Sequence, residues 1–162
     1  MILIGLGANL PSVAGAPPAT LAAALAALAE AEVRLVRRSP WYRSAPVPAG
    51  DQPWYVNGVV LVATPLSPAE LLAVLHRVEA SFGRIRRTRN EPRPLDLDLL
   101  DYDGRFRQEP PVLPHPRLHE RAFVLLPLRD VAPDWRHPAS GAGLAELIAA
   151  LPPGQEIERM AD

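Results

Sequence analysis

The alternation of apolar and polar residues along the chain predicts a series of short strands and helices. Residues 2–6 are continuously apolar and predict a buried strand, whereas the looser alternation over 33–38 predicts a strand with one face in water. The valine-rich stretch 56–63 predicts another buried strand. Before it, the many prolines and aromatic residues of 39–55 indicate an ordered loop.

The clearest helix signal covers residues 67–83. Ser67 is suited to the N-cap, Pro68 to the first helical position and Glu70 to the acid of a capping box, and Gly83 ends the segment. Between these ends, apolar residues recur at helical spacing on one face: Leu71, Leu75, Val78 and Phe82. An amphipathic helix is therefore expected here.

Three further segments complete the pattern. Thr20 is placed to be the N-cap of an earlier helix, whose apolar face carries Leu21, Leu25 and Leu28. Residues 121–128 predict a further short strand or buried segment. Residues 143–151 predict a last amphipathic helix.

The order strand, helix, strand, strand, helix, strand, with further elements after it, is typical of an α+β sandwich. We expect the ferredoxin-like α/β type, with helices on one face of a mainly antiparallel sheet. A chain of 162 residues is long enough to bury a hydrophobic core, and the sequence has no internal repeat. Residues 1–162 are therefore interpreted as a single domain.

Two carboxylates occupy alternate positions in the strand-like sequence PRPLDLDLL, residues 92–100. Alternate side chains of a strand point the same way, so Asp96 and Asp98 share one face at a spacing of roughly 6.5–7 Å. Two carboxylates at that spacing can hold one or two hard cations together with substrate oxygens. The same alternation also describes any strand with one solvated face, and most such triplets bind nothing.

An arginine-rich segment directly precedes these acids, with Arg84, Arg86, Arg87, Arg89 and Arg93. Arginine clamps beside magnesium carboxylates suit phosphoryl transfer, because its transition state spreads negative charge over several oxygens. A loop of this composition can also close over a nucleotide and exclude water. A self-neutralising surface would bring the same charges together without any ligand.

Composition narrows the classes of chemistry. The chain has no cysteine, which excludes disulfides, thiolate zinc sites and cysteine nucleophiles. All 17 basic residues are arginine, so a phosphate loop with its lysine and lysine Schiff-base chemistry are excluded as well. A net charge of −1 gives no sign of a nucleic-acid or anionic-membrane partner. Because no apolar run approaches about 20 residues, we expect a soluble cytoplasmic protein.

Several aromatic and polar residues form a candidate pocket. Tyr55 and Asn57 stand two apart on one face of their strand, and His115, Arg121 and Phe123 follow further along. Taken singly, each is more often structural, the rings as core residues and the histidine as a capped loop residue. In combination they indicate a pocket for a flat heteroaromatic ring.

With these residues assembled, the chain resembles the 6-hydroxymethyl-7,8-dihydropterin pyrophosphokinase family of folate biosynthesis. The similarity runs in order through GLGANL, YRSAPV, DQPWYVN, PRPLDLDLL and LPHPRLHERAFVLLPL, and it covers nearly the whole chain. The resemblance implies a ferredoxin-like fold. It also implies transfer of the β,γ-diphosphate of ATP to the hydroxymethyl group of the pterin, with release of AMP.

The resemblance further implies roles for individual residues. Asp96 and Asp98 are expected to hold two Mg²⁺ ions bound with ATP, and Arg84 and Arg93 to be catalytic. The residues expected to bind the pterin are Gly7, Ser44, Ala45, Val47, Tyr55, Asn57 and Phe123. Those expected to bind ATP are His76, Glu79, Arg86, His115 and Arg121. We expect a monomer that binds these two small molecules and neither nucleic acid nor membrane.

Two other functions fit part of the pattern. A ferredoxin-like sheet with aromatic residues and an arginine-rich loop can bind single-stranded RNA, although the acids that follow the arginines and the near-neutral charge argue against it. A magnesium-dependent nucleotide hydrolase could use the same pair of aspartates with water as the acceptor.

Overall fold

The computed structural model describes residues 1–46, 50–83 and 94–161. None of the helices within these ranges is long and apolar enough to cross a membrane. The elements follow the chain as β1 (Ile2–Ala8), α1 (Pro17–Glu30), β2 (Arg34–Arg38), β3 (Tyr42–Ser44), β4 (Tyr55–Ala63), α2 (Pro68–Ser81), β5 (Asp96–Tyr102), the 3₁₀ turn η1 (Leu118–Glu120), α3 (Ala122–Val131), α4 (Leu144–Ala149) and β6 (Ile157–Arg159).

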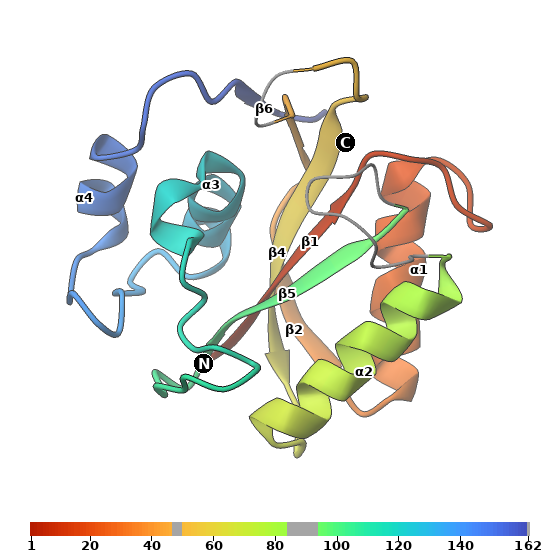
Figure 1. Ribbon diagram of the computed structural model, residues 1–162, viewed down its shortest axis with the longest axis horizontal. Helices are drawn as coiled ribbons and strands as arrows, with labels where there is room; N and C mark the ends of the chain where they lie inside the picture. The colour runs from red at the N-terminus through yellow and green to blue at the C-terminus, as the bar shows by residue number, and fades with distance from the viewer. Residues whose placement is uncertain (47–49, 84–93, 162) are drawn as a thin grey trace.

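The strands form one sheet in the order β5-β1-β4-β3-β6, with β2 also paired to β4. Each of these strand pairs is antiparallel. The central strands β1 and β4 lie side by side in the middle of the molecule (Figure 1), and α1 and α2 follow them along the chain. This arrangement confirms the predicted ferredoxin-like α+β fold.

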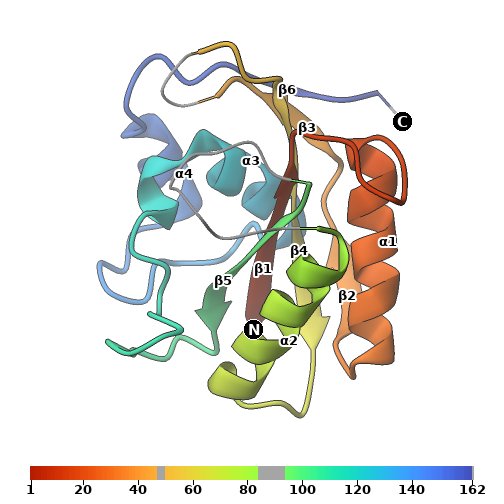
Figure 2. The same cartoon turned by 45° about the vertical axis from the view of Figure 1, so that its right-hand side comes forward.

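Helices cover both faces of the sheet, and the expectation of helices on one face is wrong. Figures 1 and 2 show α1 and α2 on one side of the strands and α3 and α4 on the other. Each layer buries its own apolar cluster, with Leu21 and Leu71 in the first and Leu125 and Leu144 in the second. The second layer arises because residues 122–131 form a helix with a buried apolar stripe.

The capping box predicted for α2 is confirmed. The Ser67 Oγ accepts a hydrogen bond from the backbone N–H of Glu70 at 3.2 Å, and Oε1 of Glu70 accepts from the backbone N–H of Ser67 at 2.9 Å. Gly83 follows the helix with a φ of +91°, a conformation that favours glycine. The predicted apolar stripe faces the core.

Helix α1 begins one turn earlier than expected, so Thr20 is not its N-cap. The helix starts at Pro17 because a proline at the first helical position lacks only an N–H that would be unpaired there. Thr20 is fully buried inside the helix, and its hydroxyl pairs with that of Ser12 at 2.5 Å. Leu21 and Leu28 are buried and Leu25 is half-buried, as their spacing predicted.

Two further segments differ in part from the expectation. Of the two alternatives for residues 121–128, the buried segment is confirmed and the strand is wrong: most of these residues belong to α3, which carries Pro127 in its interior. The segment 39–55 is not loop throughout, because β3 lies within it and pairs with β4 and β6. The strands β2, β4 and β5 and the helix α4 lie where the sequence predicted them.

Candidate functional site

The floor of the candidate site is a row of residues across three neighbouring strands. Gly7 on β1 lies opposite Asp96 on β5 on one side and opposite Asn57 on β4 on the other. A Cβ atom added at Gly7 would stand 3.1 Å from Nδ2 of Asn57, which is tighter than most contacts of real Cβ atoms. The glycine therefore keeps the floor open between a carboxylate and an amide.

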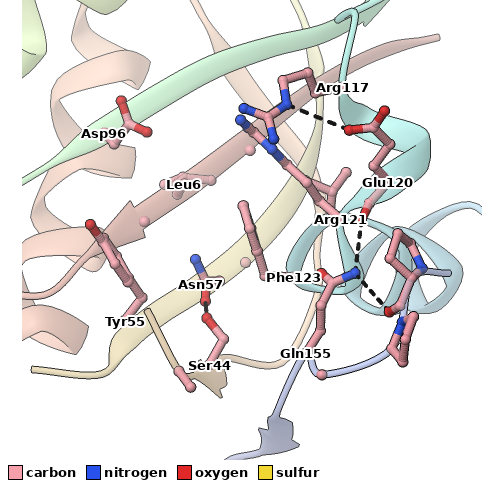
Figure 3. A pocket seen from close by; sticks show the side chains of 18 residues that line it. Leu6, Ser44, Tyr55, Asn57, Asp96, Arg117, Glu120, Arg121, Phe123 and Gln155 are labelled. Carbon is pink, nitrogen blue, oxygen red and sulfur yellow. Dashed lines mark hydrogen bonds and ion pairs between the residues drawn. The ribbon is translucent and has the colours of Figure 1, made fainter. Parts of the chain in front are cut away.

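A cavity of about 340 Å³ lies above this floor, on the sheet face that α3 covers. Tyr55 from β4 and Phe123 from α3 line it, with Asn57 between them and Asp96 at the far end (Figure 3). A cavity of this size, with aromatic walls and polar groups that converge on it, suits a small flat ligand with polar edges.

The Asn57 side chain is held in one orientation by a neighbouring strand. Ser44 on β3 donates its hydroxyl hydrogen to Oδ1 of Asn57 at 2.5 Å, and both residues are only 4% exposed. Because the oxygen of the amide is engaged, the Nδ2 donor group points away from Ser44 into the cavity (Figure 3).

Glu79 lies behind the aspartate strand and outside the cavity lining. Its side chain on α2 is 1% exposed, and Oε2 accepts the backbone N–H of Leu97 at 2.8 Å. Leu97 stands between Asp96 and Asp98, so this bond fixes the stretch of β5 that carries both carboxylates. His76, one turn earlier on α2, is exposed and does not line the cavity.

His115 is close enough to Asp96 and Arg121 for their charges to act on it. Burial and, to a lesser degree, the charge of Arg121 lower the pKa of His115 to about 4, and Asp96 opposes the shift. Nδ1 accepts the backbone N–H of Arg117 at 3.1 Å, so the proton of the neutral ring lies on Nε2. His115 therefore presents a neutral N–H donor near neutral pH.

Two arginines bring positive charge to the cavity. The Arg121 guanidinium carbon lies 5.3 Å from the centre of the Phe123 ring, and Nε of Arg117 lies 3.5 Å from Oε2 of Glu120. These three charged side chains stand together beside Phe123 in Figure 3. Of these three side chains, only Arg121 was a candidate from the sequence.

Eight candidates from the sequence line the cavity: Gly7, Ser44, Ala45, Tyr55, Asn57, Asp96, Arg121 and Phe123. Of the other described candidates, Asp98, His76, Glu79 and His115 do not line it. Asp98 remains on the same strand and face as Asp96, since the leucines between and beside them are buried on the opposite side. Val47, Arg84, Arg86 and Arg93 lie outside the described residues.

Sequence reasoning missed one whole wall of the cavity. Residues 152–155, which follow α4, line it, as do Arg117 and Glu120. No local pattern marks residues 152–155, because they reach the cavity through contacts between distant parts of the chain, such as the pairing of β6 with β3. That pairing joins the end of the chain to a short strand within a proline-rich segment.

The two aspartates suit one kind of metal site. In the part of the chain that the structure describes, no three histidine, aspartate or glutamate residues gather to hold a metal by themselves. Mg²⁺ is usually bound by one or two carboxylates together with waters and substrate phosphates, rather than by a cage of protein ligands. Asp96 and Asp98 fit Mg²⁺ that arrives with a phosphate substrate.

Comparison with known proteins gives a consistent result. The model of the 7,8-dihydro-6-hydroxymethylpterin-pyrophosphokinase family matches residues 3–133. A 2-amino-4-hydroxy-6-hydroxymethyldihydropteridine pyrophosphokinase of Pseudomonas aeruginosa is 43% identical over 161 residues, which are 98% of this chain and 96% of that protein. The Synechocystis protein of the same name is 43% identical over 148 residues, 90% of this chain and 73% of that one.

Longer proteins contain a similar region. The mitochondrial folate synthesis bifunctional protein of Pisum sativum is 38% identical over 132 residues, which are 80% of this chain and 25% of that protein. The crystal structure of a Plasmodium falciparum HPPK-DHPS triple mutant superposes with a TM-score of 0.69 at 14% identity. The match covers 91% of this chain and 43% of that one, and it supports the fold.

Proposed function

The chain belongs to the 7,8-dihydro-6-hydroxymethylpterin-pyrophosphokinase family, and we propose that it transfers the β,γ-diphosphate of ATP to 6-hydroxymethyl-7,8-dihydropterin. The products are AMP and the pterin diphosphate, an intermediate of folate biosynthesis. One observation carries the proposal: a cavity with two aromatic walls, a fixed amide on its floor and a carboxylate at its end.

The pterin ring fits the cavity by shape and by hydrogen bonding. Tyr55 and Phe123 offer aromatic faces on the two sides of Asn57, and a flat ring between them would stack on both. The Nδ2 group of Asn57 is directed to donate to an acceptor at the ring's edge. This donor requires the amide orientation that Ser44 fixes.

The diphosphate lies, in this proposal, at the end of the cavity where Asp96 stands. Asp96 and Asp98 would hold two Mg²⁺ ions with the triphosphate, and these ions would neutralise charge on the transferred group and polarise the attacking hydroxyl. Arg121 and the Nε2–H of His115 would contribute positive charge and a neutral donor near the same oxygens.

The remaining roles rest on the family resemblance. Arg84 and Arg93 would clamp the phosphates in the transition state, with Arg86 as a further nucleotide contact, and Val47 would border the pterin. We assign no side chain as general base. We also propose that residues 1–162 act as one domain, as a monomer in the cytoplasm, without binding nucleic acid.

Product analysis tests the function directly. Purified protein is incubated with ATP, Mg²⁺ and 6-hydroxymethyl-7,8-dihydropterin, and AMP, ADP and the pterin species are separated by chromatography. We expect AMP and pterin diphosphate in equal amounts, and neither when the pterin or Mg²⁺ is omitted. Formation of ADP, or release of phosphate without pterin, would replace the proposal with a different phosphoryl transfer.

A further inference from the structure

One short segment near the end of the chain contacts both walls of the cavity. The Gln155 side chain uses its whole amide: Oε1 accepts the backbone N–H of Ala122 at 2.9 Å, and Nε2 donates to the carbonyl oxygens of Glu120 at 2.9 Å and Pro152 at 3.3 Å. Two of these three bonds reach the wall that carries Phe123.

These two bonds lie on either side of Arg121. Glu120 is the last residue of η1 and Ala122 is the first of α3, while Arg121 between them has an extended backbone. The side chain of the N-cap residue Arg121 makes no capping hydrogen bond to the first turn of α3. Gln155 instead supplies an acceptor for one of the backbone N–H groups of that turn, the N–H of Ala122. These bonds to Glu120 and Ala122 therefore hold the stretch of backbone from which the Arg121 and Phe123 side chains project.

The residues beside Gln155 are tied to the opposite wall. The carbonyl oxygen of Glu156 accepts the backbone N–H of Ala45 at 3.0 Å, and Ile157 pairs with Ser44 between β6 and β3. Adjacent residues of one segment therefore bond the wall that holds Asn57 and the wall that holds Phe123. Because covalent geometry fixes the distance between adjacent residues, this segment sets the separation of the two walls.

We propose that Gln155 is a positioning residue of the pterin site, which holds Phe123 and Arg121 at the correct distance from the Ser44–Asn57 wall. The inference rests on the proposed function. It concerns a part of the chain beyond residue 133, where the family match ends. The side-chain amide of Gln155 bonds backbone groups on both sides of Arg121, so it acts through Arg121 and Phe123.

The test compares two substitutions of Gln155 in the full chain. Gln155→Met keeps the length of the side chain and removes its hydrogen bonds. Gln155→Glu keeps an acceptor for Ala122 and loses the two donor bonds. Gln108→Met is the matched control, because Gln108 is exposed in the loop after β5 and does not line the cavity.

We expect Gln155→Met to raise the Kd of the pterin about tenfold, since two bonds that hold the wall are lost. The KM for the pterin should rise similarly while kcat stays within about threefold, because the loss affects binding more than the reacting phosphate. Gln155→Glu should recover only the part of the affinity that depends on the Ala122 bond, because its second carboxylate oxygen would face the carbonyl oxygens of Glu120 and Pro152. Gln108→Met should bind as the wild type does.

Hydrogen exchange gives a readout that does not depend on activity. The Ala122 amide of the wild type should exchange slowly, and in Gln155→Met it should exchange faster while the helix interior stays protected. An unprotected Ala122 in the wild type, or wild-type pterin affinity in Gln155→Met, would overturn the inference and leave the proposed function standing. If the wild type did not bind the pterin, both the inference and the proposed function would be wrong.

Discussion

Ser44 donates its hydroxyl hydrogen to Oδ1 of Asn57, so a residue on β3 sets the orientation of the amide at the floor of the cavity. An asparagine amide can turn over, exchanging its donor and acceptor ends with little change in shape. Here the turned form would bring two hydrogen donors together at Ser44 unless the hydroxyl also rotated. The donor end is therefore presented to the ligand before it binds.

Replacing Ser44 with alanine should weaken pterin binding. The Asn57 oxygen then loses its partner, and the amide can turn its acceptor end into the cavity. The lost bond corresponds to about 0.5–1.5 kcal/mol, or roughly a 2- to 13-fold rise in Kd. Calorimetric titration with the pterin measures this, with Ser140→Ala, an exposed residue, as the control. An unchanged Kd would show that the amide is held by other means.

Phe123→Ala should weaken pterin binding while sparing ATP. Removal of the ring takes away one aromatic wall, and the loss of its stacking and burial corresponds to about 2–3 kcal/mol, or roughly 30- to 150-fold in pterin Kd. Separate titrations with the pterin and with an unreactive ATP analogue measure the two affinities. Phe106→Ala is the control, because Phe106 is 65% exposed. Equal loss of both affinities would contradict the stacking role.

Local rules predicted the parts of the molecule that local interactions determine. The Ser67–Glu70 capping box and the alternation around Asp96 and Asp98 both depend on residues within a few positions of one another. Both could therefore be predicted from the sequence. The ferredoxin-like order of elements follows from the same kind of pattern.

The errors lie where local signals compete or distant residues meet. Residues 121–128 are apolar on nearly every position and contain Pro127, so their spacing does not distinguish a helix from a strand. Thr20 has the chemistry of an N-cap, but the prolines before it start the helix earlier. The wall that includes Gln155 depends on pairing between distant strands, which no local pattern encodes.

Asp98→Ala should nearly abolish transfer. The substitution removes one of two carboxylates proposed to hold the metal, and loss of a main source of charge stabilisation lowers turnover by about 10²- to 10³-fold or more. AMP formation at saturating ATP and pterin measures it, with Asp134→Ala, an exposed carboxylate after α3, as the control. Full wild-type activity in the presence of a chelator would contradict the metal role.

Glu79→Leu should destabilise the start of β5. It leaves the buried N–H of Leu97 without this acceptor, which costs about 1–3 kcal/mol of unfolding free energy. Urea unfolding measures the loss, and the apparent Mg²⁺ affinity with ATP should fall as well, since Leu97 joins the two aspartates. Glu79→Gln keeps an acceptor and should lose less of both. Equal effects of the two substitutions would mean that the Leu97 bond is unimportant.

The low pKa of His115 should appear in the pH dependence of stability. Burial and the nearby Arg121 lower it to about 4 in the folded chain, against 6.5 for an ordinary histidine. Between these values the unfolded chain binds a proton at this site and the folded chain does not. Stability contributed by the neutral ring is therefore lost as the pH falls from about 6.5 to about 4.

His115→Gln removes this contribution, because glutamine does not titrate. Urea unfolding of both proteins at several pH values should show the wild type losing more stability than the variant over this range. The carboxylates act on both proteins alike, so the difference between the two curves isolates His115. Parallel curves, or an NMR titration of the His115 ring with a midpoint near 6.5, would contradict its burial as a neutral donor beside Asp96.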